Sequence, residues 1–204
     1  MILTFSIILW IIQGAACIAA ILYYPKYKHS SQRYFVYFLS YVVLNEILGY
    51  LVSANGYANW FLYNIFTIVS FSFYFYWFFA ILKEKKMVIL LSILFSVSIF
   101  YALIYEDFFS AIWSIPLTVG TIIILILATI FYRNLLNKTE VVNFKRSQKF
   151  WIVSGLLIFY LGFLPIQLFM FTLSIKGIPI RIMITILNII LYGCYIKSFL
   201  CLKK

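Results

Sequence analysis

Charged residues are scarce in this chain of 204 residues. They make up only 10% of the sequence, whereas a soluble domain carries about a quarter. Hydrophobic residues account for 66% and aromatic residues for 22%, which is more apolar surface than a globule of this length can bury. The composition therefore excludes an ordinary soluble protein and predicts an integral membrane protein.

The residues on which metal sites and most enzymes depend are also rare. One histidine leaves no zinc-binding spacing, and we expect Cys17, Cys194 and Cys201 to be small buried side chains. The sequence has no phosphate-binding glycine loop, nucleophile elbow or metal-binding helix motif. We expect no metal and no cofactor. Acid–base catalysis is also disfavoured, because the membrane-embedded region offers one carboxylate and no second acid.

Long apolar runs are abundant, and seven of them reach the length of about 20 residues that a membrane-spanning helix needs. They cover residues 2–24, 34–52, 60–82, 87–105, 110–132, 150–172 and 180–200. None shows the alternation of a barrel strand. The first run lacks a preceding basic segment and a cleavage site, so we expect a retained helix. The sequence predicts an all-α bundle of seven transmembrane helices forming one domain over residues 1–204, with no soluble domain.

Basic residues follow the loops on one side of the predicted bundle. All of the 16 lysines and arginines except Lys176 and Arg181 lie on that side. Because cytoplasmic loops are enriched in Lys and Arg, we expect the N-terminus outside and the C-terminus in the cytoplasm. This distribution indicates topology and contact with the lipid bilayer rather than nucleic-acid binding. The longest connection, Arg133–Lys149, is a possible docking segment for a protein partner.

Polar side chains recur in the outer half of the predicted spans. The candidates for ligand binding or proton coupling are Glu46, Asn45, Asn64, Gln167, Arg181, Asn188 and Tyr192. Glu46 stands out in "YVVLNEILGYLV", because a mid-span carboxylate costs about 2.5–3.5 kcal/mol on insertion scales. We expect it to face the interior, either protonated and bonded to Asn64 or Asn188, or ionised and paired with Arg181. A purely structural hydrogen-bonding role stays open, as does an Arg181 side chain that extends outward.

Two prolines and one polar helix face extend this pattern. Pro116 and Pro165 are predicted to kink their spans and to free the carbonyls of Ile112 and Leu161. On the last span the polar residues recur at helical spacing, and they are Arg181, Thr185, Asn188, Tyr192 and Tyr195. Kinks and amides at one depth predict an outward-facing polar cavity around Glu46.

The segments "LNEILGYL" and "WFLYNIFTI" resemble small seven-helix integral membrane proteins of AT-rich bacteria that have no assigned activity. The resemblance implies a seven-helix membrane fold and a bacterial inner-membrane location. The helix number is similar to that of microbial rhodopsins, but retinal attachment needs a lysine where Asn188 and Tyr192 stand, so a retinal protein is excluded. We expect a ligand-binding or sensory protein that acts through a partner. A small transporter or proton-coupled permease using Glu46, and a structural or assembly subunit, are the alternatives.

Overall fold

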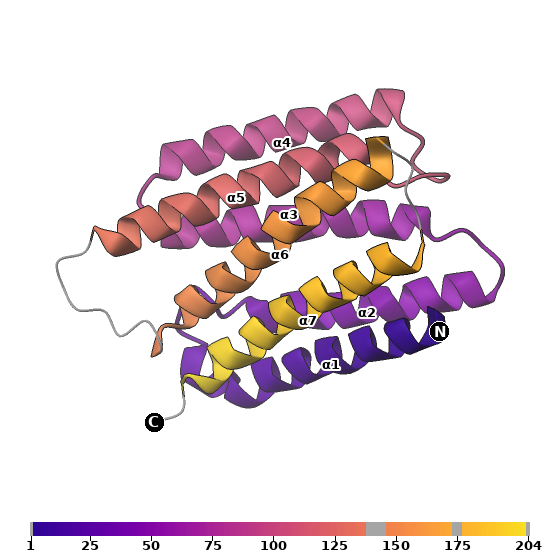
Figure 1. The fold of residues 1–204 in the computed structure, drawn as a ribbon. Helices are drawn as coiled ribbons and strands as arrows, with labels where there is room; N and C mark the ends of the chain where they lie inside the picture. Colours follow the sequence, from indigo (N-terminus) through magenta and orange to yellow (C-terminus); the bar gives the residue numbers. More distant parts are fainter. Residues whose placement is uncertain (1, 138–145, 173–176, 203–204) are drawn as a thin grey trace.

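The structure, a computed structural model, describes residues 2–137, 146–172 and 177–202. Within these residues the chain forms seven helices, and each is long and apolar enough to cross a membrane. They are α1 (Ile2–Tyr27), α2 (Phe35–Ala54), α3 (Trp60–Ile81), α4 (Lys85–Tyr105), α5 (Ser114–Leu136), α6 (Gln148–Thr172) and α7 (Ile178–Leu200) (Figure 1). The predicted all-α arrangement is confirmed, and the seven apolar helices suggest a multi-pass membrane protein.

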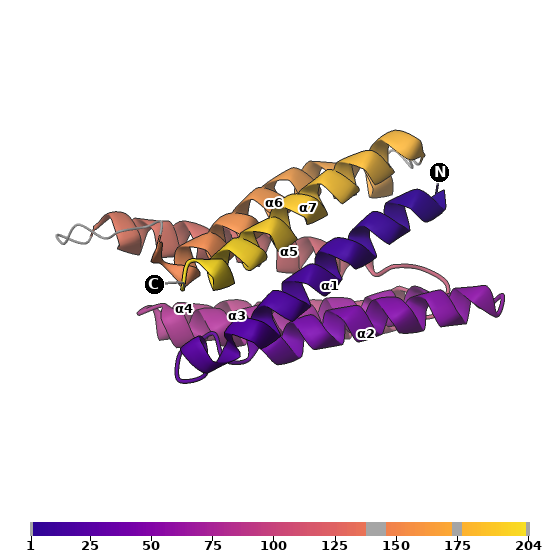
Figure 2. The same ribbon diagram turned by 90° about the horizontal axis from the view of Figure 1, so that it is seen from below.

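Each helix packs against the next one along the chain, and α7 closes the ring by packing against α1. In Figure 2, α2, α3 and α4 lie in one layer, α6 and α7 lie in another, and α1 runs obliquely from the first toward the second. α5 packs against α3, α4 and α6, so it joins the two layers. The two termini lie at opposite ends of the bundle (Figure 1).

Aromatic rings fill the interior between α2, α3 and α7. Phe38 stacks on Phe73 with ring centroids 4.2 Å apart, and Phe35 meets Trp77 and Tyr195 edge to face. Such edge and stacked pairs add to the energy of burial alone. These ring contacts therefore contribute to holding α2, α3 and α7 together.

Two glycines allow α6 to approach α7 closely. A Cβ at Gly155 would lie 2.8 Å from the Cβ of Cys194, and one at Gly162 would lie 2.6 Å from a methyl carbon of Leu187. Small residues at helix interfaces are the usual means of close packing in membrane bundles. This explains why both positions lack a side chain.

The two prolines expected to kink their helices, Pro116 and Pro165, lie at different positions within α5 and α6. α5 begins at Ser114 rather than at residue 110, so Pro116 is in the first turn. First-turn N–H groups have no partner within a helix, so Pro116 removes no hydrogen bond and requires no kink, which corrects the expectation. Pro165 does lie inside α6, where its ring removes the bond to the Leu161 carbonyl.

The alternating direction of the helices brings the basic connections to the end that carries the C-terminus. This end holds Lys28 and Arg33 before α2, Lys83 before α4, and Arg133 near the end of α5. Of the basic residues predicted to mark the two sides, Lys138, Lys145, Lys176, Lys203 and Lys204 lie outside the described residues.

Candidate functional site

A cavity of about 510 Å³ opens at the end of the bundle that carries the N-terminus. Its walls come mainly from α1, α2 and α3, with Ile112 from the α4–α5 connection and Arg181 from α7. Figure 2 shows α1 diverging from α2 toward this end, and the cavity lies between these helices. Three of the predicted site residues, Glu46, Asn45 and Arg181, line it together.

Local sequence explains why the cavity forms on α2. Gly49 lies one turn after Glu46 and also lines the cavity, so no side chain fills the space there. The Gly49 carbonyl accepts a hydrogen bond of 3.2 Å from the Asn59 amide, which ties the connection before α3 to α2. Asn45 is buried beside Glu46, whereas Glu46 itself is half-buried.

Glu46 takes its hydrogen bond from a residue that the sequence reasoning missed. Gln13 Nε2 on α1 donates to Glu46 Oε1 at 3.4 Å and to the Tyr192 hydroxyl at 3.5 Å. Gln13 is only 5% exposed, and its Oε1 is buried without a partner among the described residues. One amide group on α1 therefore connects α2 and α7, and it links Tyr192 to Glu46 indirectly.

Neither of the two pairings expected for Glu46 occurs. Asn64 and Asn188 bond elsewhere, and within the described ranges no ion pair joins Glu46 to Arg181. Arg181 is exposed in the first turn of α7, as expected for a side chain that extends outward. The Glu46 carboxyl group and the Arg181 guanidinium therefore line the same cavity without a direct ion pair between them.

Asn64 lies at the predicted depth but serves the α4–α5 connection. Its Nδ2 donates to the carbonyls of Phe108 and Ala111 at 2.9 Å each, and its Oδ1 accepts from the Trp113 N–H at 2.9 Å. Asn64 is fully buried. All three of these hydrogen bonds hold the connection between α4 and α5, and Asn64 is not among the residues that line the cavity.

The other two amides also form contacts away from the cavity. Gln167 on α6 donates to the Thr118 hydroxyl on α5 at 2.7 Å, and it is 1% exposed. Asn188 donates to the Ile184 carbonyl of its own helix at 2.8 Å. The predicted cluster is thus divided. Glu46, Asn45 and Arg181 line the cavity, whereas the amides form hydrogen bonds elsewhere, and these are Asn64, Gln167 and Asn188.

Aromatic side chains form much of the cavity wall, which polar-residue reasoning did not predict. Trp10 meets Tyr50 edge to face with centroids 5.2 Å apart, and Trp60 and Tyr63 line the cavity from α3. The signal for Trp10 was its unusual mid-span position, and the signal for Gln13 was a lone amide in "WIIQGAAC". A carboxylate beside aromatic faces is an arrangement that binds cations.

Two further buried tyrosines, Tyr195 and Tyr74, lie beyond Tyr192 on the side away from the cavity. Tyr192 lies edge to face with Tyr195, their centroids 5.8 Å apart, and the Tyr195 hydroxyl lies 3.0 Å from that of Tyr74 on α3. All three residues are buried. The polar face predicted on the last span therefore faces the bundle interior at Tyr192 and Tyr195.

Comparison with known proteins gives no matching family model, no similar curated protein and no similar solved structure. Over the described part of the chain, no three His, Cys, Asp or Glu side chains lie close enough together to hold a metal ion.

Proposed function

We propose that this protein is a multi-pass membrane protein of the bacterial inner membrane, with its C-terminus in the cytoplasm, that binds a small solute in the cavity around Glu46. The positive-inside distribution of Lys and Arg supports this orientation. In it, the cavity opens to the outside, because it lies at the end opposite the basic connections.

The observation that carries the proposal is a carboxylate and aromatic rings lining one cavity of about 510 Å³. Glu46 supplies a carboxyl group, and Trp10, Trp60 and Tyr63 supply aromatic rings, and both kinds of side chain attract cations. Arg181 lies at the exposed side and would pair with an anionic group on the same solute. The cavity therefore favours a small cation or a zwitterion over an anion.

Equilibrium binding to the purified protein tests this function, with choline, glycine betaine and acetate as probes. We expect choline and glycine betaine to bind and acetate not to bind. Glu46→Gln should weaken choline binding by about 2 kcal/mol or more, roughly thirtyfold in Kd. Glu84→Gln is the matched control, since Glu84 lies in the α3–α4 connection at the other end of the bundle. Equal binding of choline by both variants would refute the proposal.

A second function, proton-coupled transport, is supported by the contact of Gln13 with both Glu46 and Tyr192. Beyond Tyr192, the ring of Tyr195 packs against that of Tyr192, and the Tyr195 hydroxyl bonds with that of Tyr74 toward the other end. In reconstituted vesicles, transport predicts solute flux that depends on a pH gradient and that is lost in both Glu46→Gln and Gln13→Leu. Binding without flux favours the sensory function.

A sensory function requires a protein partner, because the described residues contain no domain outside the helices. The basic connection Arg133–Lys149 is the proposed docking segment, although residues 138–145 lie outside the described residues. Co-purification of a partner that is lost when this connection is neutralised would support signalling. A partner whose binding does not respond to choline would instead favour an assembly subunit.

A further inference from the structure

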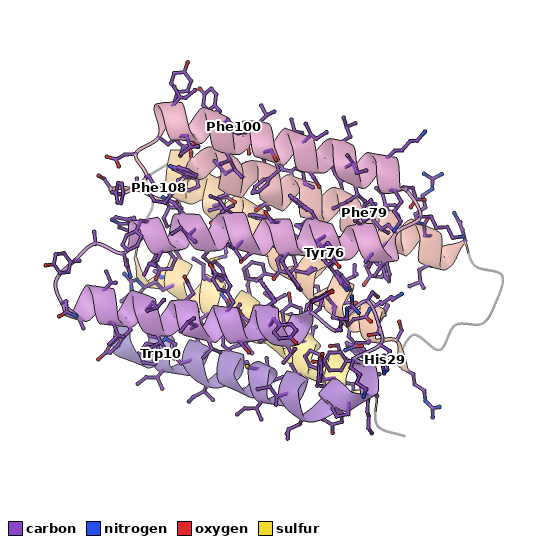
Figure 3. The ribbon with its side chains drawn as sticks, turned by 180° about the vertical axis from the view of Figure 1, so that it is seen from behind. Trp10, His29, Tyr76, Phe79, Phe100 and Phe108 are labelled. Carbon is purple, nitrogen blue, oxygen red and sulfur yellow. The ribbon has the colours of Figure 1, made fainter. Side chains whose placement is uncertain are left out.

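A second hollow lies at the opposite end of the bundle from the Glu46 cavity. It has a volume of about 440 Å³ and is lined by Tyr24, Lys28, His29, Arg33, Tyr34 and Tyr37. Figure 3 places His29 and Trp10 toward opposite ends of the molecule, so the two hollows are separate. This hollow plays no part in the function proposed above.

The charge of this hollow is entirely positive. Lys28 and His29 are exposed, and among the described residues neither side chain has a hydrogen bond or an ion pair. Arg33 lies over the Tyr34 ring at 4.5 Å and donates a hydrogen bond to its hydroxyl. No acidic residue lines the hollow. Among the described residues, the connection between α3 and α4 at this end holds Glu84, whose carboxylate accepts a hydrogen bond from Asn134 on α5 at 2.8 Å.

The connection that carries these cations is held in place by hydrogen bonds. Ser30 Oγ donates to the Tyr27 carbonyl at 2.7 Å and accepts from the Gln32 N–H at 3.2 Å. The Tyr27 hydroxyl donates to the Ala20 carbonyl at 2.7 Å, which anchors the end of α1. The basic side chains therefore project from a preformed turn, so an anion that binds them need not order the backbone first.

An apolar groove of about 420 Å³ begins where the basic hollow ends. Tyr34 and Tyr37 line both. The groove continues between α2 and α3 along Phe38, Tyr41, Val69, Phe73 and Tyr76. The stacked rings of Phe38 and Phe73 contribute to its floor. Figure 3 views this face of α2 and α3, with Tyr76 on α3 toward the end where His29 lies.

We propose that the hollow and the groove together bind one anionic phospholipid. The phosphate lies against Lys28, His29 and Arg33, and an acyl chain lies along the groove between α2 and α3. Two observations select this occupant. The described side chains that line the hollow include positive charges and no acid, and the groove that continues from it is apolar and lies on helices apolar enough to cross a membrane.

Native mass spectrometry of the purified full chain tests the proposal, with dioleoyl phosphatidylglycerol and dioleoyl phosphatidylcholine as probes that share acyl chains. We expect the anionic lipid to remain bound preferentially. Each basic side chain near an anionic headgroup changes affinity about fivefold, so K28Q/R33Q should weaken phosphatidylglycerol binding about 25-fold. K83Q/K86Q is the control, because it removes the same charge at the same end but outside the hollow.

A second variant tests the groove and does not depend on the folding of K28Q/R33Q. Val69→Trp places an indole in the groove from an exposed position and should reduce phosphatidylglycerol retention at least about fivefold. Equal retention of the two lipids by the native chain would overturn the proposal. So would equal loss in K83Q/K86Q, or no loss in Val69→Trp. Displacement of the lipid by inorganic phosphate would show a free-phosphate site instead and would overturn the lipid assignment.

Discussion

The amide of Gln13 and the carboxylate of Glu46 meet across the interface between α1 and α2, with Nε2 3.4 Å from Oε1. Because the same amide also reaches the Tyr192 hydroxyl, this contact joins three helices around one polar group. Polar bonds of this kind contribute about 0.6–2 kcal/mol in membrane bundles. The contact therefore holds Glu46, which lines the cavity, to a buried side chain of α1.

Gln13→Leu replaces the amide with an apolar group of similar size and leaves Glu46 and Tyr192 without their shared donor. We expect the free energy of unfolding to fall by about 1–3 kcal/mol, measured as loss of helix signal on titration with a denaturing detergent. Ser96→Ala is the control, because the Ser96 hydroxyl bonds only to the Ser92 carbonyl of its own helix. Equal stability of the Gln13→Leu variant and the native chain would contradict the bridging role.

Asn64→Ala removes three hydrogen bonds that hold the connection between α4 and α5. Two carbonyls and one N–H then lose their partner, so we expect a loss of about 2–4 kcal/mol in the same unfolding measurement. Asn188→Ala removes only a bond within α7 and should cost about 1 kcal/mol or less. The reverse order of the two losses would show that Asn64 does not support the connection.

Gly155→Ala introduces a Cβ where the Cβ of Cys194 and the Leu191 carbonyl leave no space. Neither atom can rotate away, so α6 and α7 must separate, at a cost of about 1–3 kcal/mol. Gly162→Ala should cost less, because the Leu187 methyl group that it meets can move. Gly14→Ala meets nothing within 4 Å and should be neutral or slightly stabilising. Thermal unfolding of the three variants measures the order of their stability losses, and a destabilised Gly14→Ala variant would contradict the expected order.

We expect the stabilising contribution of Asp107, in the connection before α5, to depend on pH. Hydrogen bonds from the Ser110 hydroxyl and from the Phe109 and Ser110 N–H groups lower the pKa of its carboxyl below the ordinary value of 3.8. A lowered folded pKa means that the contribution of Asp107 to stability is present above 3.8 and is lost as the pH falls through the folded value. The stability difference between the native chain and Asp107→Asn should therefore be constant near neutral pH and shrink in acid. A difference that grows in acid would contradict the assignment.

The helices were predictable because each one is specified by its own residues. All seven predicted spans overlap the observed helices, and the largest shift at a helix start is in α5, where Glu106 accepts from the N–H groups of Ser114 and Ile115. That start depends on an acidic side chain eight or nine residues earlier along the chain. Hydropathy along the sequence does not predict such a contact.

The candidate site was only partly predictable. Depth placed Glu46, Asn64, Gln167 and Asn188 in the same half of the bundle, but each has a different partner. The depth of a residue in its helix does not determine how that helix is rotated about its axis or which side chains the residue meets. Gln13 was missed because it stands alone in an apolar run, and only the position of α1 between α2 and α7 gives it a role.

The sequence by itself determined the number, the approximate limits and the apolar character of the helices. It could do so because backbone groups in an apolar medium must bond within each helix, which is a local requirement. Only the tertiary structure decided which polar groups share a cavity. That outcome depends on how the helices rotate and pack, as shown by Gly155 and Gly162 where α6 meets α7 and by the divergence of α1 from α2 toward the end that carries the N-terminus.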